Sequence, residues 1–432
     1  MKKNIAALLT GLMLLALTGC FTQPLGDLYA LPKQAEDYYN LQQAIDAVMQ
    51  NASYAAPITG DNRQAVQLRD LDDDGKNEAI LFSRTEGEHP LKIYIFHRDG
   101  NLFSQIACLE GDGISFDCVQ YVQLDGKGGP ELLVGRQLSD EVLQTLNVYT
   151  ISPDGATELL YANYSEFFTA DLTENGNGEL LLFRMESQER NGLVEMYSWQ
   201  DDALRCTQHA ELSVSAESIR RIVSGKLDGG ASAVFVTSLL DESSFITDVF
   251  TIRGGKLTNL AKRCEEEDLF TVQQEAIFAS DIDSDGKIEL PKALRQGGQN
   301  TSLIQWCSLS EEAKTEVKLL TCQNSYDRWY IELLQRWQKD LLIGEHTVDG
   351  LGRTTVFSIR TASGTRELFT VFALTGEERN TQAQADGRFL LGSKTDVTFA
   401  ASIGEAGMKD NLNAEDLQAW FHLIPDPTNN ET

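Results

Sequence analysis

The sequence predicts a mainly β protein: a β-propeller of about five four-stranded blades, followed by a small α+β domain at the C-terminal end. An acidic, glycine-containing block recurs about every 50 residues, apolar bursts with strand-like alternation follow each block, and the repeat stops after Cys322. Four short antiparallel strands per repeat of this length are typical of propeller blades. A single blade cannot bury both faces of its sheet, so neighbouring blades must stack around a shared axis.

The repeated blocks define the blades. Their second residue is apolar at positions 71, 124, 172, 227 and 282, which are separated by 53, 48, 55 and 55 residues. In the first unit, the burst Ala79 to Phe82 is followed by the alternating stretch Leu91 to Phe96, and a turn at Asp99-Gly100 leads to another apolar segment. With the segment before each block, this gives about four strands per unit. An array of β-sandwiches is the alternative, and the short, even spacing favours the propeller.

The N-terminus reads as an export signal. Lys2 and Lys3 precede an apolar run from Ile5 to Leu17, which is shorter than the roughly 20 residues of a membrane-spanning helix. The run ends in Leu17-Thr18-Gly19-Cys20, which resembles the lipobox of bacterial lipoproteins. This resemblance implies a leader over 1–19, a lipid on the Cys20 thiol, and a protein anchored to the cell membrane on its extracytoplasmic side. A secretory signal with a chance cysteine is the alternative.

Four further regions follow the leader. We expect a tether over 20–35, an N-terminal helix and lead-in over 36–60, the propeller over 61–322 and the α+β domain over 323–432. The apolar spacing from Ala35 to Met49 fits an amphipathic helix that caps the first blade or binds a partner.

The C-terminal domain opens with a Trp-rich stretch. We expect strands near Thr355 to Ile359, Glu367 to Leu374 and Phe389 to Ala401, and a helix from Asn413 to Leu423 with Asn413 as its N-cap. This order loosely resembles the Mog1/PsbP-type domains. Three tryptophans are expected to pack in the core rather than to line a ligand groove: Trp329, Trp337 and Trp420.

Two of the acidic blocks have the spacing of a calcium loop. Alternate acidic residues point several carboxylates at one centre, the glycine permits the turn, and the final glutamate can close a shell of hard oxygens. The predicted ligands are Asp70, Asp72, Asp74, the Lys76 carbonyl and Glu78 in the first unit, and Asp281, Asp283, Asp285, the Lys287 carbonyl and Glu289 in the fifth. A weaker site is expected at Asp171, Thr173, Asn175 and Glu179. Ordinary acidic turns are the alternative.

The other two units have lost the first carboxylate. Gln123 and Lys226 stand at that position, and the lysine ammonium is expected to substitute for an ion. Repeats and loops together resemble the FG-GAP/VCBS repeat proteins, as in integrin alpha-chain propellers, over about 260 residues. The resemblance implies structural calcium that stabilises the propeller loops.

Charge and motifs limit the function. With 36 Lys and Arg against 65 Asp and Glu, the net charge of −29 argues against a nucleic-acid partner. The chain has no HExxH, GxSxG or Walker-type motif, and its six cysteines after Cys20 are expected to be mostly buried free thiols, although export permits disulfides.

We therefore expect a non-enzymatic binding or scaffold lipoprotein that presents the propeller face to a protein or glycan. The alternatives are a carbohydrate-active enzyme with its site at the channel mouth, and a cell-envelope assembly factor.

Overall fold

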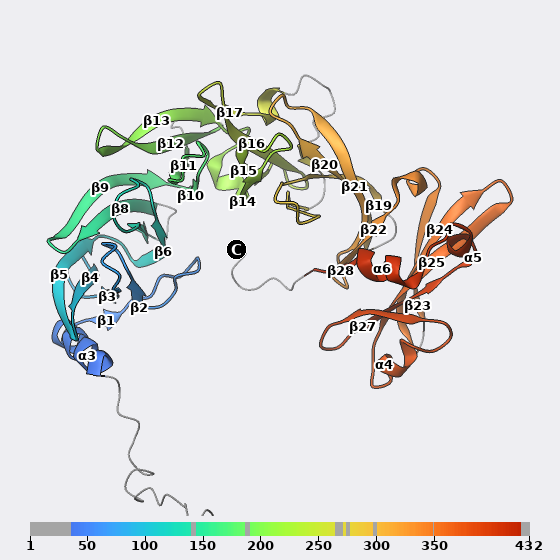
Figure 1. Ribbon diagram of the computed structural model, residues 1–432, viewed down its shortest axis with the longest axis horizontal. Coiled ribbons are helices and arrows are strands. Elements are labelled where there is room, and N and C mark those ends of the chain that lie inside the picture. Colours follow the sequence, from blue (N-terminus) through green and yellow to red (C-terminus); the bar gives the residue numbers. More distant parts are fainter. Residues whose placement is uncertain are drawn as a thin grey trace, which may run out of the picture.

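The computed structural model describes residues 36–139, 144–185, 191–263, 271–273, 277–296, 300–348 and 350–424. The leader, Cys20, the tether and Cys264 lie outside these residues. The predicted mainly β, propeller-type architecture is confirmed: antiparallel sheets follow one another side by side along an arc (Figure 1). The arc is open, with the first sheet at one end and the last at the other (Figure 1).

Five sheets correspond to the five repeats, and each contains four strands in chain order. The first three blades are β2 (Val66–Arg69), β3 (Glu78–Arg84), β4 (Leu91–Asp99) and β5 (Leu102–Gly111); β6 (Ser115–Val122), β7 (Glu131–Gln137), β8 (Gln144–Ser152) and β9 (Gly155–Tyr164); β10 (Glu166–Ala170), β11 (Glu179–Met185), β12 (Gly192–Gln200) and β13 (Ala203–Glu211). The other two are β14 (Ile219–Lys226), β15 (Ser232–Leu239), β16 (Phe245–Arg253) and β17 (Lys256–Asn259); β19 (Leu290–Gln296), β20 (Thr301–Leu309), β21 (Thr315–Asn324) and β22 (Trp329–Leu333). Short strands β1 (Ser53–Tyr54) and β18 (Val272–Gln273) join the first and fourth sheets.

The second strand of each of the first four blades explains why the blades stack. β3, β7, β11 and β15 are buried on both faces along most of their length, because neighbouring blades cover both sides, with the N-terminal helix in place of a blade on one side of β3. Their sequences are accordingly almost continuous apolar runs, whereas the outer strands β5, β9 and β13 carry exposed polar residues.

Each junction between blades has its own apolar core. Phe82 of the first blade meets Phe116 of the second edge-on, with ring centroids 5.2 Å apart. Separate clusters join the second blade to the third, the third to the fourth, and the fourth to the fifth. The structure is thus a series of nearest-neighbour interfaces, as stacked repeats require.

The fifth sheet continues beyond the expected end of the propeller. The boundary that we placed between residues 322 and 323 falls inside β21, and β22 then pairs with β28 (Phe421–Leu423). The sixth sheet follows in the order β23 (Leu341–Val348), β24 (Gly352–Thr361), β25 (Gly364–Leu374), β27 (Thr398–Ile403) and β26 (Phe389–Ser393). Its helices are α4 (Arg379–Gln382), α5 (Glu405–Lys409) and α6 (Ala414–Trp420).

Two details of this region differ from the prediction. The stretch Phe389 to Ala401 forms two strands rather than one. Asn413 does cap α6, with a complete capping box to Asp416, but the helix ends at Trp420 because the next three residues form β28. Trp329 and Trp337 are buried in the core that joins the fifth and sixth sheets, and Trp420 packs against it, as expected.

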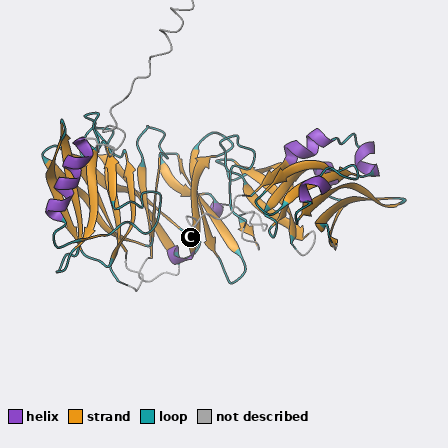
Figure 2. Ribbon diagram, turned by 90° about the horizontal axis from the view of Figure 1, so that it is seen from below, coloured by secondary structure: helices purple, strands orange, loops and turns teal. Residues whose placement is uncertain are grey.

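The α-helices lie at the two ends of the molecule (Figure 2). α3 (Glu36–Val48) occupies the stretch for which a helix was expected, and its Leu41 and Ile45 pack against β3 and β4. Short 3-10 helices are η1 (Ala216–Ser218), η2 (Ala261–Arg263) and η3 (Gln335–Trp337). No helix among the described residues is long and apolar enough to cross a bilayer. The five described cysteines are unpaired, with Cys206 exposed and Cys307 and Cys322 buried.

Candidate functional site

The acidic loops connect the first two strands in the first four blades, and the fifth loop precedes β19. The first, third and fifth loops share one backbone conformation. Their fourth residue lies in the left-handed region, with φ of 61° at Asp73, 58° at Glu174 and 61° at Ser284. Their glycines are left-handed as well, at 82° for Gly75 and 83° for Gly286, which explains why glycine follows the third acidic position.

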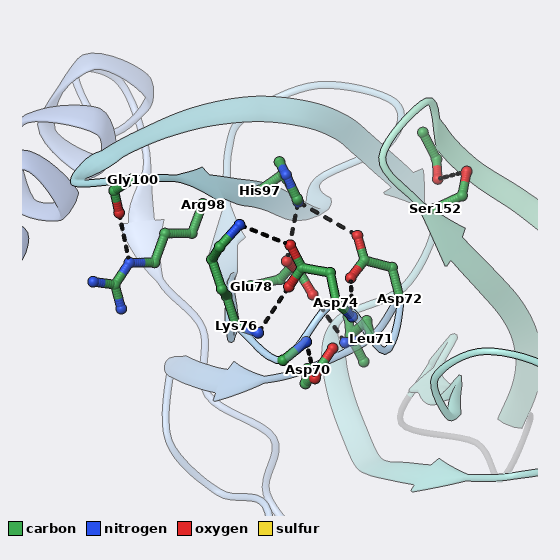
Figure 3. Close-up of polar contacts among 12 residues, drawn as sticks. Asp70, Leu71, Asp72, Asp74, Lys76, Glu78, His97, Arg98, Gly100 and Ser152 are labelled. Atoms are coloured by element: carbon green, nitrogen blue, oxygen red, sulfur yellow. Dashed lines mark hydrogen bonds and ion pairs between the residues drawn. The ribbon is translucent and has the colours of Figure 1, made fainter.

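The first loop brings its predicted ligands together (Figure 3). Asp70, Asp72 and Asp74 each place a carboxylate oxygen within 4.8 Å of the others. Asp70 also accepts the Gly75 N–H at 2.9 Å, and Asp74 accepts the Lys76 N–H at 2.7 Å. The Lys76 ammonium lies 3.0 Å from the second Asp74 oxygen, and this ion pair lowers the pKa of Asp74.

Glu78 differs from the expected ligand because it points into the protein. It is fully buried and accepts the Leu71 N–H at 2.8 Å, so it closes the loop backbone. Burial raises its pKa. Its other oxygen lies 3.2 Å from Nδ1 of His97 on β4, a residue that the sequence analysis did not select.

The fifth loop has the same arrangement without a histidine. Asp281, Asp283 and Asp285 also lie within 4.8 Å of one another, and Asp281 accepts the Gly286 N–H at 2.9 Å. Glu289 is fully buried and accepts the Ile282 N–H at 3.2 Å. Burial, followed by the nearby aspartates, raises the pKa of Glu289 to about 7. The Lys287 ammonium lies 3.2 Å from Asp228 in the preceding loop.

The other three loops make polar contacts of a different kind, although Glu131 Oε1 in the second has no hydrogen bond. In the third loop, the Thr173 hydroxyl donates a hydrogen bond to Glu179 Oε1 at 2.6 Å. This oxygen is therefore already occupied and is not available to a cation. In the fourth, the Lys226 ammonium lies 2.6 Å from Glu174 of the third loop, so its recorded ion pair is with a neighbouring loop. In the second, Glu131 was missed by the sequence analysis, yet it is buried and accepts the Leu124 N–H at 2.8 Å.

Buried carboxylate oxygens without hydrogen bonds occur in three of the loops. In the first loop, no hydrogen bond reaches Asp70 Oδ1 or Asp72 Oδ2, in the fifth none reaches Glu289 Oε1, and in the second none reaches Glu131 Oε1. Of these three loops, the first and the fifth also bring three aspartates together. A buried carboxylate oxygen without a partner is costly, and a bound divalent cation would remove that cost. The donor sets of the first and fifth loops therefore fit a cation that prefers oxygen.

A cavity of about 790 Å³ lies where the fourth, fifth and sixth sheets meet. Its wall combines aromatic rings with cationic side chains, and one edge is formed by the fifth acidic loop. Residues that line it include Arg221, Phe278, Asp281, Trp306, Arg328, Tyr330, Leu391 and His422. Four distant chain segments supply these residues, so no local motif marks the cavity.

An acid–base pair lies in this wall. His422 on β28 has Nε2 2.9 Å from Glu332 Oε1 on β22, and its ring stacks on Tyr330 with centroids 4.6 Å apart. Burial raises the pKa of Tyr330, so its phenol stays protonated at neutral pH. The Arg221 guanidinium lies over the Phe278 ring at 5.7 Å. An imidazole, a protonated phenol and a guanidinium thus share one cavity.

Neither a protein-family model nor a curated protein matches the sequence. Among solved structures, the chain is similar to the exotype rhamnogalacturonan lyase YesX, with 9% identity and a TM-score of 0.29 over 82% of this chain and 76% of that one. It is also similar to an exo-β-1,3-galactanase from Phanerochaete chrysosporium, with 9% identity and a TM-score of 0.25 over 74% and 80%. The β-propeller domain of the trilobed protease from Pyrococcus furiosus, which has an open velcro topology, gives 9% identity and 0.26 over 79% and 92%.

These comparisons correct the expected function. The similar structures are mostly polysaccharide lyases and glycosidases, contrary to the expectations of a non-enzymatic binding or scaffold module and of a chain without enzymatic activity. The carbohydrate-active alternative agrees better with them. At these TM-scores, none of the similar structures assigns a residue or a substrate to this chain.

Proposed function

We propose that this chain is a carbohydrate-active enzyme that cleaves an acidic polysaccharide at the cavity between the fourth, fifth and sixth sheets. The observation that carries the proposal is the combination of Arg221, Tyr330 and His422 in one wall. Sugar rings pack on aromatic side chains, and a guanidinium binds a carboxylate with matched hydrogen bonds. In a protein of net charge −29, arginines in a cavity favour an anionic ligand there.

The chemistry that fits these groups is β-elimination. Arg221 would neutralise the uronate carboxylate, which acidifies the proton on the adjacent ring carbon. His422, oriented by Glu332, would accept that proton, and the released electron pair would form a carbon–carbon double bond as the glycosidic C–O bond breaks. Tyr330 would donate its proton to the departing oxygen. The products are a new free sugar end and an unsaturated uronate.

The test is cleavage of acidic and neutral polysaccharides by the full chain. Polygalacturonate or a rhamnogalacturonan should yield ultraviolet-absorbing unsaturated ends, and a neutral galactan should not. His422→Gln should reduce the rate at least about 100-fold, the usual contribution of a general base. His209→Gln, at an exposed position on β13, is the matched control and should leave the rate unchanged.

Two outcomes would contradict the proposal. New reducing ends without ultraviolet absorbance would replace β-elimination by hydrolysis. An equal rate in wild type and His422→Gln, or no product from any polysaccharide, would remove the cavity as the active site.

We also propose that calcium stabilises two of the loops and that a lipid anchors the chain. Calcium at Asp70, Asp72 and Asp74 and at Asp281, Asp283 and Asp285 would stabilise the first and fifth loops, in line with the buried oxygens that lack hydrogen bonds there. A lipid on Cys20 would hold the enzyme at the extracytoplasmic face of the cell membrane, where polymeric substrates are encountered. The relationship to FG-GAP/VCBS repeats and to Mog1/PsbP-type domains also stays a prediction. Mass spectrometry of the exported protein tests the lipid directly.

A further inference from the structure

We infer that the first blade contains a binding site for a transition-metal dication such as Zn²⁺, formed by Asp72, Glu78 and His97, and that this site binds such an ion more tightly than calcium. One ligand atom from each residue lies within 4.8 Å of the other two. Figure 3 shows the His97 ring directed at both carboxylates. The inference does not depend on the cavity chemistry proposed above.

The distances suit a short metal–ligand bond. His97 Nδ1 lies 3.2 Å from Glu78 Oε1 and 3.5 Å from Asp72 Oδ2. Two atoms bound to one ion at about 2.1 Å, with an angle between about 90° and 110°, lie about 3.0–3.4 Å apart. The His97 nitrogen is therefore already close to zinc-shell spacing from each of the two carboxylate oxygens.

Burial supplies an independent indication. The Asp72 side chain is only 5% exposed and the Glu78 side chain is fully buried, and no hydrogen bond reaches Asp72 Oδ2. The other oxygens are held from behind: Glu78 accepts the Leu71 N–H, and Asp72 accepts the Asp74 N–H at 3.2 Å. Such outer contacts orient ligands toward a metal.

The ligand chemistry separates this site from the fifth loop. Imidazole nitrogen favours Zn²⁺ and related ions, whereas all-oxygen loops favour calcium. In blade one, Phe96 pairs with Ala79, the residue after the loop glutamate, and His97 follows. The equivalent positions in the other blades are Thr150, Ser198, Ile252 and Ser308, and none of these offers a nitrogen ligand.

The experiment is metal titration of the chelator-treated full chain, read out by the melting temperature and by binding calorimetry. Zn²⁺ should raise the melting temperature and bind at one tight site. Co²⁺ should give a visible absorption band as the imidazole coordinates. His97→Ser introduces the residue of the fifth blade and should weaken Zn²⁺ binding at least about 100-fold. The calcium-induced shift should persist in that variant and fall in Asp283→Ala.

The matched control is His89→Ser. His89 also pairs with a carboxylate, Asp112 at 2.6 Å, but both side chains are more than half exposed, and His89 belongs to none of the described groups of three potential metal ligands. It should leave Zn²⁺ binding unchanged. The inference is overturned if Zn²⁺ stabilises His97→Ser as much as wild type, or if Zn²⁺ binds no tighter than calcium. In either case, His97 is only an ion-pair partner of Glu78.

Discussion

At the scale of single residues, the glutamate that ends each of four acidic loops has a role that spacing alone does not reveal. Glu78, Glu131, Glu179 and Glu289 each accept the N–H of the apolar second residue in their own loop. The hydrogen bond closes the loop whether or not carboxylates suited to an ion are present. Glu131 shows this, because its loop begins with Gln123 rather than an aspartate.

Glu131 also predicts a pH dependence of stability. Burial raises its pKa to about 7, so the folded protein favours the protonated form. An acid with a raised folded pKa contributes its full stability below its unfolded pKa and loses it as pH rises through the folded value. Wild type should therefore lose up to about 3 kcal/mol relative to Glu131→Gln between pH 4.5 and 7.5.

Urea unfolding at several pH values measures this difference. Gln keeps an oxygen that can accept the Leu124 N–H but cannot ionise. Glu312→Gln, at an exposed position between β20 and β21, controls for the loss of one negative charge and should follow wild type. If the free energy of unfolding changed with pH equally in wild type and Glu131→Gln, ionisation of the Glu131 carboxyl would not destabilise the folded protein, and the prediction would be wrong.

At the scale of elements, successive acidic loops lie against one another along one edge of the arc. Gly178 N–H donates to the Gln123 carbonyl at 2.8 Å, and the Lys226 carbonyl accepts the Ile288 N–H at 3.1 Å. At Gly129, an added Cβ would lie 2.3 Å from the Leu71 backbone of the preceding loop. The glycine is required by the close approach of two loops rather than by its own turn.

Gly129→Ala should therefore destabilise the protein by about 2 kcal/mol or more, because rigid backbone cannot move aside as a side chain can. The matched variant is Gly229→Ala in the fourth loop, where the nearest atom to an added Cβ is a Glu311 side-chain oxygen at 3.5 Å. Thermal unfolding of both variants measures the difference. If the two variants had equal melting temperatures, the first two loops would move apart to accept the added methyl group without destabilising the protein.

The repeat predicted these elements well because acidic blocks and apolar bursts are local signals. The position of every block, and the strands that follow it, can be read from period-2 alternation and turn residues. The contact between His97 and Glu78 cannot be predicted from these local signals, because it depends on the register of β3 against β4. Nothing in the sequence near His97 sets it apart from the other four histidines.

At the scale of the whole molecule, the fifth and sixth sheets share one core. That cluster contains Trp329 and Ile331 from the fifth sheet, Phe369 and Phe399 from the sixth, and Trp337 between them. Trp337 is 1% exposed, and its indole N–H donates to Asp410 at 2.7 Å. The two sheets should consequently unfold together.

Trp337→Ala tests this coupling. Removing a buried tryptophan should cost about 3–5 kcal/mol. Hydrogen exchange should rise together in β21 and β25, which belong to different sheets. Tyr161→Ala, at a 59% exposed position of β9, should change neither. Faster exchange in β25 alone would show that the sixth sheet is an independent domain.

Sequence reasoning placed a domain boundary in this region because the repeat ends there. The pairing of β22 with β28 joins segments about 90 residues apart, and the cavity is assembled from pieces of three sheets. Such contacts depend on how complete sheets dock, which no window of sequence encodes. A three-residue strand after α6 also carries too few residues to show alternation.

The open arc has a mechanical consequence. In a closed propeller, an applied force is distributed over all blades. In an open arc, the force passes through each interface between neighbouring sheets in turn. Under tension applied at its extremities, this molecule should give way from the outermost sheets inward. It would lengthen by roughly one repeat at a time from the N-terminal end, and by the coupled fifth and sixth sheets in one step at the other end, so that the inner blades keep their shape while the outer ones yield.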